Sequence, residues 1–393
     1  MMLKEIYIVS AKRTPLGGFQ GALSSQTAPQ LGAVAIQAAL TAAGIQPDQV
    51  DEVYMGNVIS AGVGQAPARQ AALKASLPVS TPCTTVSKVC GSGMKSVMLA
   101  ADAMQLGGVD CVVAGGMESM SLAPYLLPKA RAGFRLGHQS TKDSMFVDGL
   151  EDADSGRLMG EFGQQTADRF GIGREAMDAF AIESLRRATE ATDKAYFTDE
   201  IAALEIQGRG GVTTVVEDEQ VRTAKPEKIP QLKPAFAKDG TVTAANSSSI
   251  SDGAAALVLM TEDAMAARGA SALAKISAYE SHAQKPEEFT LAPIGAMQKL
   301  LQKLDWRVDD VDLFEINEAF AVVTMAAMQE LGIPRDKVNV NGGACALGHP
   351  LGASGARIIV TLVHALRRLD KKRGIASLCI GGGEATAIAV ELV

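Results

Sequence analysis

One pattern of apolar residues occurs twice in the chain, 261 positions apart, and this repeat limits the possible folds more than any other feature. Residues 31–53 align with residues 292–314, with apolar positions coinciding. A second match pairs VVAGGMES at 112–119 with CIGGGEAT at 379–386, each an apolar run that ends in glycines. Any two helix and strand units can look alike, but two packed copies of one α/β unit explain the length and the repeat together.

Strand-like and helical patterns alternate along most of the chain. The strand-like runs are at 5–9, 52–55, 84–89 and 111–114, and the helical patterns at 31–43 and 92–106. This alternation is typical of βαβ units, so we expect a largely parallel sheet whose strands are buried on both faces.

The segment from about 122 to 249 is different, because it is rich in charged and turn residues. It predicts an inserted, mostly exposed subdomain with helices at 161–170 and 175–195. The expected division is a first half of residues 1–121 plus 250–272, an insertion of 122–249, and a second half of 273–393.

Composition excludes several classes of protein. The 393 residues carry 37 Lys and Arg against 44 Asp and Glu, and the net charge of −7 argues against a general nucleic-acid binder. No apolar run reaches the roughly 18 residues that a membrane span needs, so we expect a cytoplasmic protein without membrane association. The five cysteines include no CxxC pair, and the four histidines show no ligand spacing, so no disulfide framework or metal site is expected.

Cys90 is the first candidate for chemistry. It lies in TTVSKVCGSGMKSV, where a β-branched run to Val89 predicts a strand, GSG a tight turn and residues 94–106 a helix. A thiol at a helix N-terminus is favoured as the thiolate, so this position predicts a lowered pKa. The alternative is a small residue that packs in a crowded turn.

His349 and Cys379 occupy similar glycine-rich places in the second half. His349 lies in NGGACALGHPLGASG, just before a predicted helix, and Cys379 precedes three glycines at the end of an apolar run. Taken alone, the first could be a structural hydrogen bonder and the second a core residue. Asn317, at a strand-to-helix junction, could be a helix cap. If the halves are related by a pseudo-twofold axis, Cys90 and His349 can face each other as an activated nucleophile and its base.

Four segments together resemble the signature of the thiolase family. They are VCGSG around Cys90, NEAF at 317–320, GHPLGASG at 348–355 and CIGGGEA at 379–385, and the resemblance covers essentially the whole chain. It implies an α/β fold of two pseudo-symmetric halves in α/β/α/β/α layers, with an inserted loop subdomain that binds CoA. It also implies a homotetramer.

The resemblance implies an acyltransferase that condenses two acetyl-CoA reversibly to acetoacetyl-CoA and CoA through an acetyl-Cys90 intermediate. His349 would activate the thiol and, with a water held by Asn317, stabilise the enolate oxygen. Cys379 would exchange the α-proton. The amides of Cys90 and Gly381 would hold the oxygen of the acylated cysteine. The alternative within this chemistry is a broader 3-ketoacyl-CoA thiolase of fatty-acid β-oxidation.

Other classes fit the residues less well. A silent acyl-CoA or lipid carrier on the same fold would not need Cys90, Asn317, His349 and Cys379 together. A ketosynthase would carry two histidines with one cysteine. CoA is expected as substrate and product, with no bound cofactor and no metal.

The resemblance also implies residues for CoA binding. Ala244 and Ser248 match positions that contact the pantetheine arm, and Arg222 lies one residue out of register with the family's basic residue near the adenine.

Two departures from the family pattern concern the acyl pocket. Acetoacetyl-specific members typically read His-Met-Gly where this chain has Leu158 and Met159 before a glycine, and Phe289 replaces a methionine. Met159 and Phe320 still match bulky positions, which favours short acyl groups.

Overall fold

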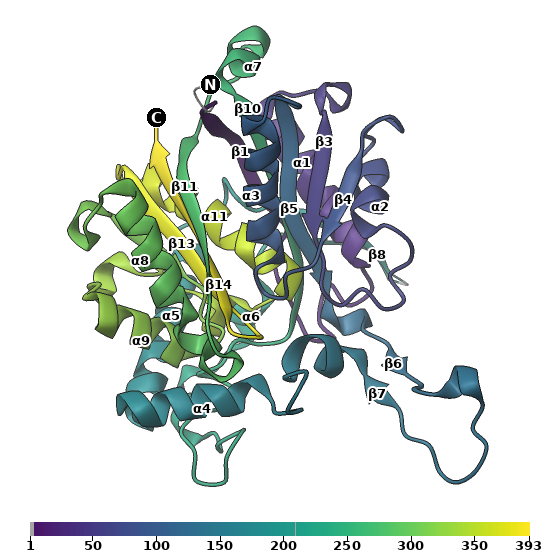
Figure 1. The fold of residues 1–393 in the computed structure, drawn as a ribbon, viewed down its shortest axis with the longest axis vertical. Helices are drawn as coiled ribbons and strands as arrows, with labels where there is room; N and C mark the ends of the chain where they lie inside the picture. The colour runs from purple at the N-terminus through teal and green to yellow at the C-terminus, as the bar shows by residue number, and fades with distance from the viewer. Residues whose placement is uncertain (1–3, 209) are drawn as a thin grey trace.

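The computed structural model describes residues 4–208 and 210–393, and a single mixed sheet of ten strands runs through it (Figure 1). The strands are β1 (Ile6–Arg13), β2 (Gly17–Gly18), β3 (Glu52–Gly56), β4 (Cys83–Val86), β5 (Cys111–Ser119), β10 (Ser251–Thr261), β11 (Ala274–Ala283), β12 (Leu313–Ile316), β13 (Arg373–Ile380) and β14 (Glu384–Leu392). Their order is β12-β13-β14-β11-β1-β10-β5-β3-β4, and β2 pairs with β10.

The sheet consists of two halves that are joined by a short contact. The first is β1-β10-β5-β3-β4 and the second is β12-β13-β14-β11. Between them, β1 and β11 pair only through Tyr7 with Lys275 and Ile8 with Ala274. This division agrees with the sequence repeat, since residues 31–53 lead into β3 and residues 292–314 lead into β12.

The prediction of a largely parallel sheet is wrong. Among the ten strands given above, only β3 with β4, β3 with β5, and β12 with β13 are parallel, whereas β10 and β14 are antiparallel to both neighbours. The parallel pairs are those that a helical crossover connects. By contrast, β14 follows β13 through a tight turn at 381–383, which forces an antiparallel hairpin.

Helices form the other layers, which confirms the expected α/β/α/β/α arrangement. The central helices, α3 (Ser92–Gln105) and α11 (Leu351–Arg368), pack on each other between the two halves of the sheet. Outside the first half are α1 (Ala28–Ala43) and α2 (Pro67–Lys74), and outside the second are α8 (Ala292–Leu304) and α9 (Ala321–Leu331).

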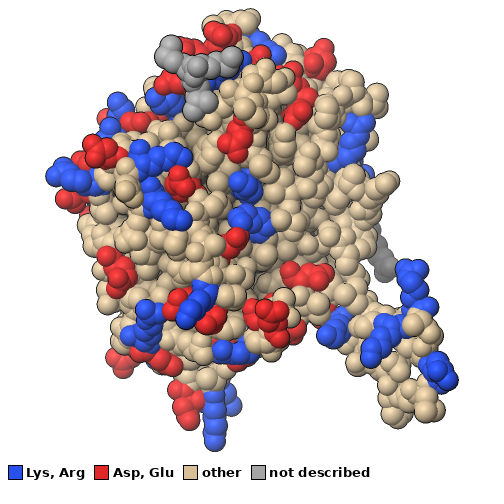
Figure 2. All heavy atoms as spheres, in the orientation of Figure 1, with Lys and Arg blue, Asp and Glu red and all other residues tan. Residues whose placement is uncertain are grey.

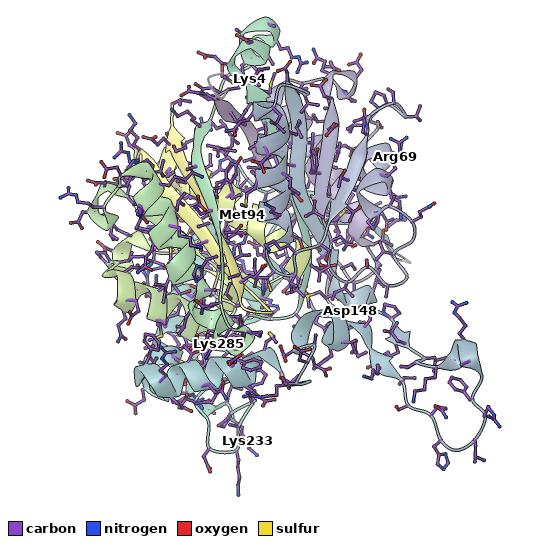
Figure 3. The ribbon with its side chains drawn as sticks, viewed as in Figure 1. Lys4, Arg69, Met94, Asp148, Lys233 and Lys285 are labelled. Carbon is purple, nitrogen blue, oxygen red and sulfur yellow. The ribbon has the colours of Figure 1, made fainter. Side chains whose placement is uncertain are left out.

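The two central helices cross very closely. A Cβ on Gly355 of α11 would lie 2.4 Å from the backbone nitrogen of Met94 on α3, so only glycine fits there. Met94, which is labelled at the centre of Figure 3, is fully buried. This approach brings the N-terminal ends of both helices to one place between the halves.

Residues 122–249 contain both an exposed arm and buried helices. Residues 127–142 are all exposed and project from the body, and Figure 2 shows Lys and Arg side chains along this arm. In contrast, α4 (Met159–Phe170) and α5 (Arg174–Asp193) each bury one face, so the expectation of a mostly exposed segment fails for these helices. The helices and strands of the segment are β6 (Tyr125–Leu126), β7 (Lys142–Asp143), α4 (Met159–Phe170), α5 (Arg174–Asp193), β8 (Leu204–Gly208), β9 (Gly211–Val215) and α6 (Glu219–Thr223).

Two further short α-helices of the described residues are α7 (Glu262–Arg268) and α10 (Ala344–Leu347). Among the described residues, no helix combines the length and apolar character needed to cross a membrane.

Candidate active site

The turn that carries Cys90 connects β4 to α3. The strand ends at Val86, three residues earlier than predicted, because the chain turns there. The N–H of Gly91 donates to the carbonyl of Lys88 at 3.0 Å, and that of Ser92 to the carbonyl of Val89 at 3.1 Å. Val89 has φ +43°, an uncommon and strained conformation for a β-branched residue. The turn places Cys90 two residues before the first residue of α3.

The prediction of a lowered pKa for Cys90 is wrong. Burial raises the pKa of this thiol to about 11, because a buried thiolate loses its hydration. Hydrogen bonds from the amides of Gly381 and of Cys90 itself favour the thiolate, but they do not offset the burial. The resting residue is therefore a thiol, and a base has to take its proton before it can attack.

His349 lies between α10 and α11 and is suited to be that base. Its Nδ1 lies 2.6 Å from the hydroxyl oxygen of Ser354, and this hydroxyl donates to the carbonyl of Pro350 at 2.9 Å. We therefore assign the ring proton to Nδ1, which donates to Ser354 and leaves Nε2 able to accept a proton. Burial, together with the charge of Arg357, lowers the pKa of His349 to about 3. The imidazole is thus neutral at physiological pH.

Asn317 lies directly after β12 and next to this imidazole. Its Nδ2 is 3.4 Å from Nδ1 and 3.5 Å from Nε2 of His349, and its Oδ1 accepts from Arg357 at 3.5 Å. Because a guanidinium only donates, it fixes which end of the amide faces the histidine. Asn317 is not the cap of α9, since Phe320 occupies that position.

Cys379 is fully buried near the end of β13, and Gly381 follows in the turn to β14. Burial and the neighbouring Cys90 raise the pKa of Cys379 well above its usual range, so this residue is also a thiol at rest. Glu318 has a structural place, because its carboxylate accepts hydrogen bonds from Ser184, Asn339 and the amide of Cys345.

A cavity of about 370 Å³ opens next to these groups. Cys90, His349 and Gly381 line it, whereas Asn317 and Cys379 do not belong to its lining. Asp148, which is labelled in Figure 3, belongs to the segment 146–150, and Phe146, Gly149 and Leu150 of this segment line the cavity. Six of the seven residues that the sequence predicts for substrate binding line the cavity: Leu158, Met159, Ala244, Ser248, Phe289 and Phe320.

Arg222, the seventh, is not among the lining residues. Its guanidinium forms ion pairs with Asp193 at 2.6 Å and Glu217 at 2.7 Å. A second cavity of about 310 Å³ shares Ala244 and Ser249 with the first, and its lining includes Lys225 and Lys228.

The sequence did not point to several residues of the site. Phe236 lines the cavity and packs edge-on against Phe320, with 6.0 Å between ring centroids. Ser354 and Arg357 reach His349 and Asn317 from α11. Ser354 lies within the glycine-rich segment after His349, and Arg357 lies two residues after its last glycine, which was the available signal. Within the described ranges, no cluster of three or more His, Cys, Asp or Glu could hold a metal ion.

Comparisons with known proteins give one consistent result. Sequence models of the thiolase N-terminal and C-terminal domains match residues 6–263 and 270–392. An acetyl-CoA acetyltransferase of Cupriavidus necator is 49% identical over 391 residues, with 99% of this chain and 100% of that protein covered. One of Escherichia coli is also 49% identical, with 99% of each chain covered.

Solved structures agree with the sequence comparisons. The acetyl-CoA acetyltransferase of Bacillus anthracis superposes with a TM-score of 0.97 at 41% identity, covering 100% of this chain and 99% of that one. A thiolase from Ascaris suum in complex with coenzyme A gives a TM-score of 0.94 at 41% identity, covering 99% and 100%. The chain belongs to the thiolase family.

Proposed function

We propose that this protein is an acetyl-CoA C-acetyltransferase, which condenses two acetyl-CoA to acetoacetyl-CoA and CoA and catalyses the reverse thiolysis. The observation that carries the proposal is that Cys90, His349 and Gly381 line a single apolar cavity, with Cys379 beside Cys90. The names of the relatives, acetyl-CoA acetyltransferases, support the acetyl group as the group that is transferred.

In the first half-reaction, Cys90 takes the acetyl group from acetyl-CoA. Its sulfur attacks the thioester carbon as its proton moves to Nε2 of His349. The bond between that carbon and the CoA sulfur breaks, and the leaving thiolate takes the proton of Cys379. The raised pKa of Cys379 supports this role, because the residue begins the cycle as a proton donor. The amides of Cys90 and Gly381 hold the thioester oxygen.

In the second half-reaction, the Cys379 thiolate removes an α-proton from a second acetyl-CoA. The imidazolium of His349 and the amide of Asn317, through a water, stabilise the enolate oxygen. The carbanion attacks the acetyl carbon, the bond from that carbon to the sulfur of Cys90 breaks, and His349 returns a proton to this sulfur. All three side chains are then restored.

The apolar cavity suits the pantetheine arm and a short acyl group, with CoA acting as substrate and no bound cofactor. Leu158, Met159, Phe289 and Phe320 restrict the acyl end. For the phosphate-bearing end of CoA, the second cavity with Lys225 and Lys228 is better placed than Arg222. A thiolysis rate that stays flat out to long acyl chains would favour the broad-chain alternative.

We further propose a homotetramer that works in the cytoplasm in fatty acid metabolism. The arm exposes the apolar side chains of Leu127, Phe134 and Leu136, and these support assembly because large exposed apolar surfaces mark interaction sites. Two reactive thiols require a reducing compartment. Light scattering tests the assembly, and a monomeric mass would contradict it.

Intact-mass analysis after brief exposure to acetoacetyl-CoA tests the function and the nucleophile together. The protein should gain one acetyl group on the peptide that contains Cys90, and Cys90→Ser should gain none. Cys379→Ala should still be acetylated by acetyl-CoA but should fail to form acetoacetyl-CoA. Condensation at the wild-type rate in Cys379→Ala would contradict the role of this residue.

A further inference from the structure

Two turns, one from each half, contact each other beside the two reactive cysteines. Residues 88–91 precede α3, and residues 380–384 run from the last residue of β13 through the turn to the first residue of β14. A Cβ on Gly91 would lie 2.4 Å from Cδ1 of Ile380, and one on Gly381 would lie 3.9 Å from Cγ1 of Val89. The position of one turn therefore depends on that of the other.

An ion pair between Lys88 and Glu384 connects these two turns. Lys88 lies two residues before Cys90, and Glu384 lies three residues after Gly381. The two side chains are 22% and 38% exposed, so solvent screens their attraction only in part.

The backbone of Lys88 is tied to the same turn. Its N–H donates to the hydroxyl of Ser92 at 2.8 Å, and its carbonyl accepts from Gly91 at 3.0 Å. A displacement of Lys88 would therefore also displace the strained Val89 and Cys90. Strained backbone of this kind persists only where its surroundings hold it.

The other end of α3 has a comparable contact with the second half. The hydroxyl of Tyr279 on β11 donates to Asp102 at 2.5 Å. Helix α3 is thus connected to the second half near both ends, but of these two contacts only the Lys88–Glu384 pair joins the turn that carries Cys90. The Tyr279 contact therefore offers a matched control.

We propose that Lys88 and Glu384 are positioning residues that set the sulfur of Cys90 against the amide of Gly381. This inference rests on the proposed acyl transfer. Neither side chain belongs to the cavity lining, so both act through the two turns and not on the substrate. Loss of the pair should then lower the rate of acylation and leave substrate binding unchanged.

A charge-reversal cycle tests the proposal. K88E places a second carboxylate beside Glu384, and E384K places a second ammonium beside Lys88, so both single variants separate the turns. Because misplacing reacting groups by about 1 Å can cost on the order of a hundredfold in rate, each should lower kcat by roughly 5- to 50-fold, with KM within about twofold of wild type. The double variant K88E/E384K restores the attraction and should recover most of kcat.

Tyr279→Phe is the control and should lower Tm without changing kcat. Lys88→Met, which removes the charge with similar bulk, should lower kcat and serves if a reversal variant does not fold. Single variants with wild-type kcat, or a double variant no faster than the slower single, would overturn the proposal. Failure of the wild-type protein to become acetylated would instead overturn the proposed function.

Discussion

Removal of the Ser354 hydroxyl should slow acetylation of Cys90 without weakening substrate binding. In the first half-reaction His349 gains a proton, and its Nδ1–H bond to Ser354, 2.6 Å between heavy atoms, becomes a bond from a cation. Bonds from charged donors contribute about 1–2 kcal/mol more than neutral ones. Ser354→Ala forfeits this difference in the transition state, so the acetylation rate should fall by about 5- to 30-fold.

Rapid-quench mass analysis of a single turnover measures this rate directly. Ser96→Ala is the matched control, because Ser96 is an equally buried serine on α3 whose hydroxyl donates to the carbonyl of Ser92. KM should remain near wild type, since Ser354 does not line the cavity. If Ser354→Ala acetylates as fast as Ser96→Ala, then Ser354 does not hold the tautomer of His349.

Two further predictions follow from charges at the site. In substrate-free protein, the rate at which iodoacetamide alkylates Cys90 should rise about tenfold per pH unit between about pH 7 and 9. The reason is that a pKa raised to about 11 keeps the thiolate fraction small until the pH is high. Peptide mapping identifies the alkylated residue, and a rate that levels off below pH 9 would refute this prediction. Lys228→Ala should raise KM for CoA about two- to fivefold and KM for dephospho-CoA less, because it removes a cation from the second cavity. Lys233, which points away from the body in Figure 3, supplies the control Lys233→Ala, and equal effects of both substitutions would argue against this site.

The sequence predicted the elements of the fold better than their directions. The alternating patterns located α3 and β3 to within a few residues, and the repeat predicted two halves. Apolar periodicity does not say which way a strand runs, so the antiparallel β10 and β14 were missed. The strand before Cys90 was predicted too long, because its last β-branched residue, Val89, is in a left-handed turn.

The sequence predicted those features of the site that depend on residue type and missed those that depend on tertiary packing. The thiol of Cys90, the imidazole of His349 and the thiol of Cys379, each near glycines, could be identified in the amino-acid sequence. The pKa of Cys90 depends on burial by distant segments, which a local helix start does not reveal. The ion pairs of Arg222 were missed for the same reason. The fold places Asp193 and Glu217 beside this guanidinium, and a local sequence pattern does not reveal such long-range ion pairs.

The order of strands in the first half has a consequence for synthesis of the chain. β10 lies between β1 and β5, yet it follows them by well over a hundred residues, after the whole segment 122–249. While the protein emerges from the ribosome, β1 and β5 therefore have open hydrogen-bonding edges until residue 261 is available. At that stage the nascent chain exposes the unpaired edges of β1 and β5 that β10 will later occupy. We therefore expect chaperones that bind unpaired strand edges to act mainly at this stage of synthesis.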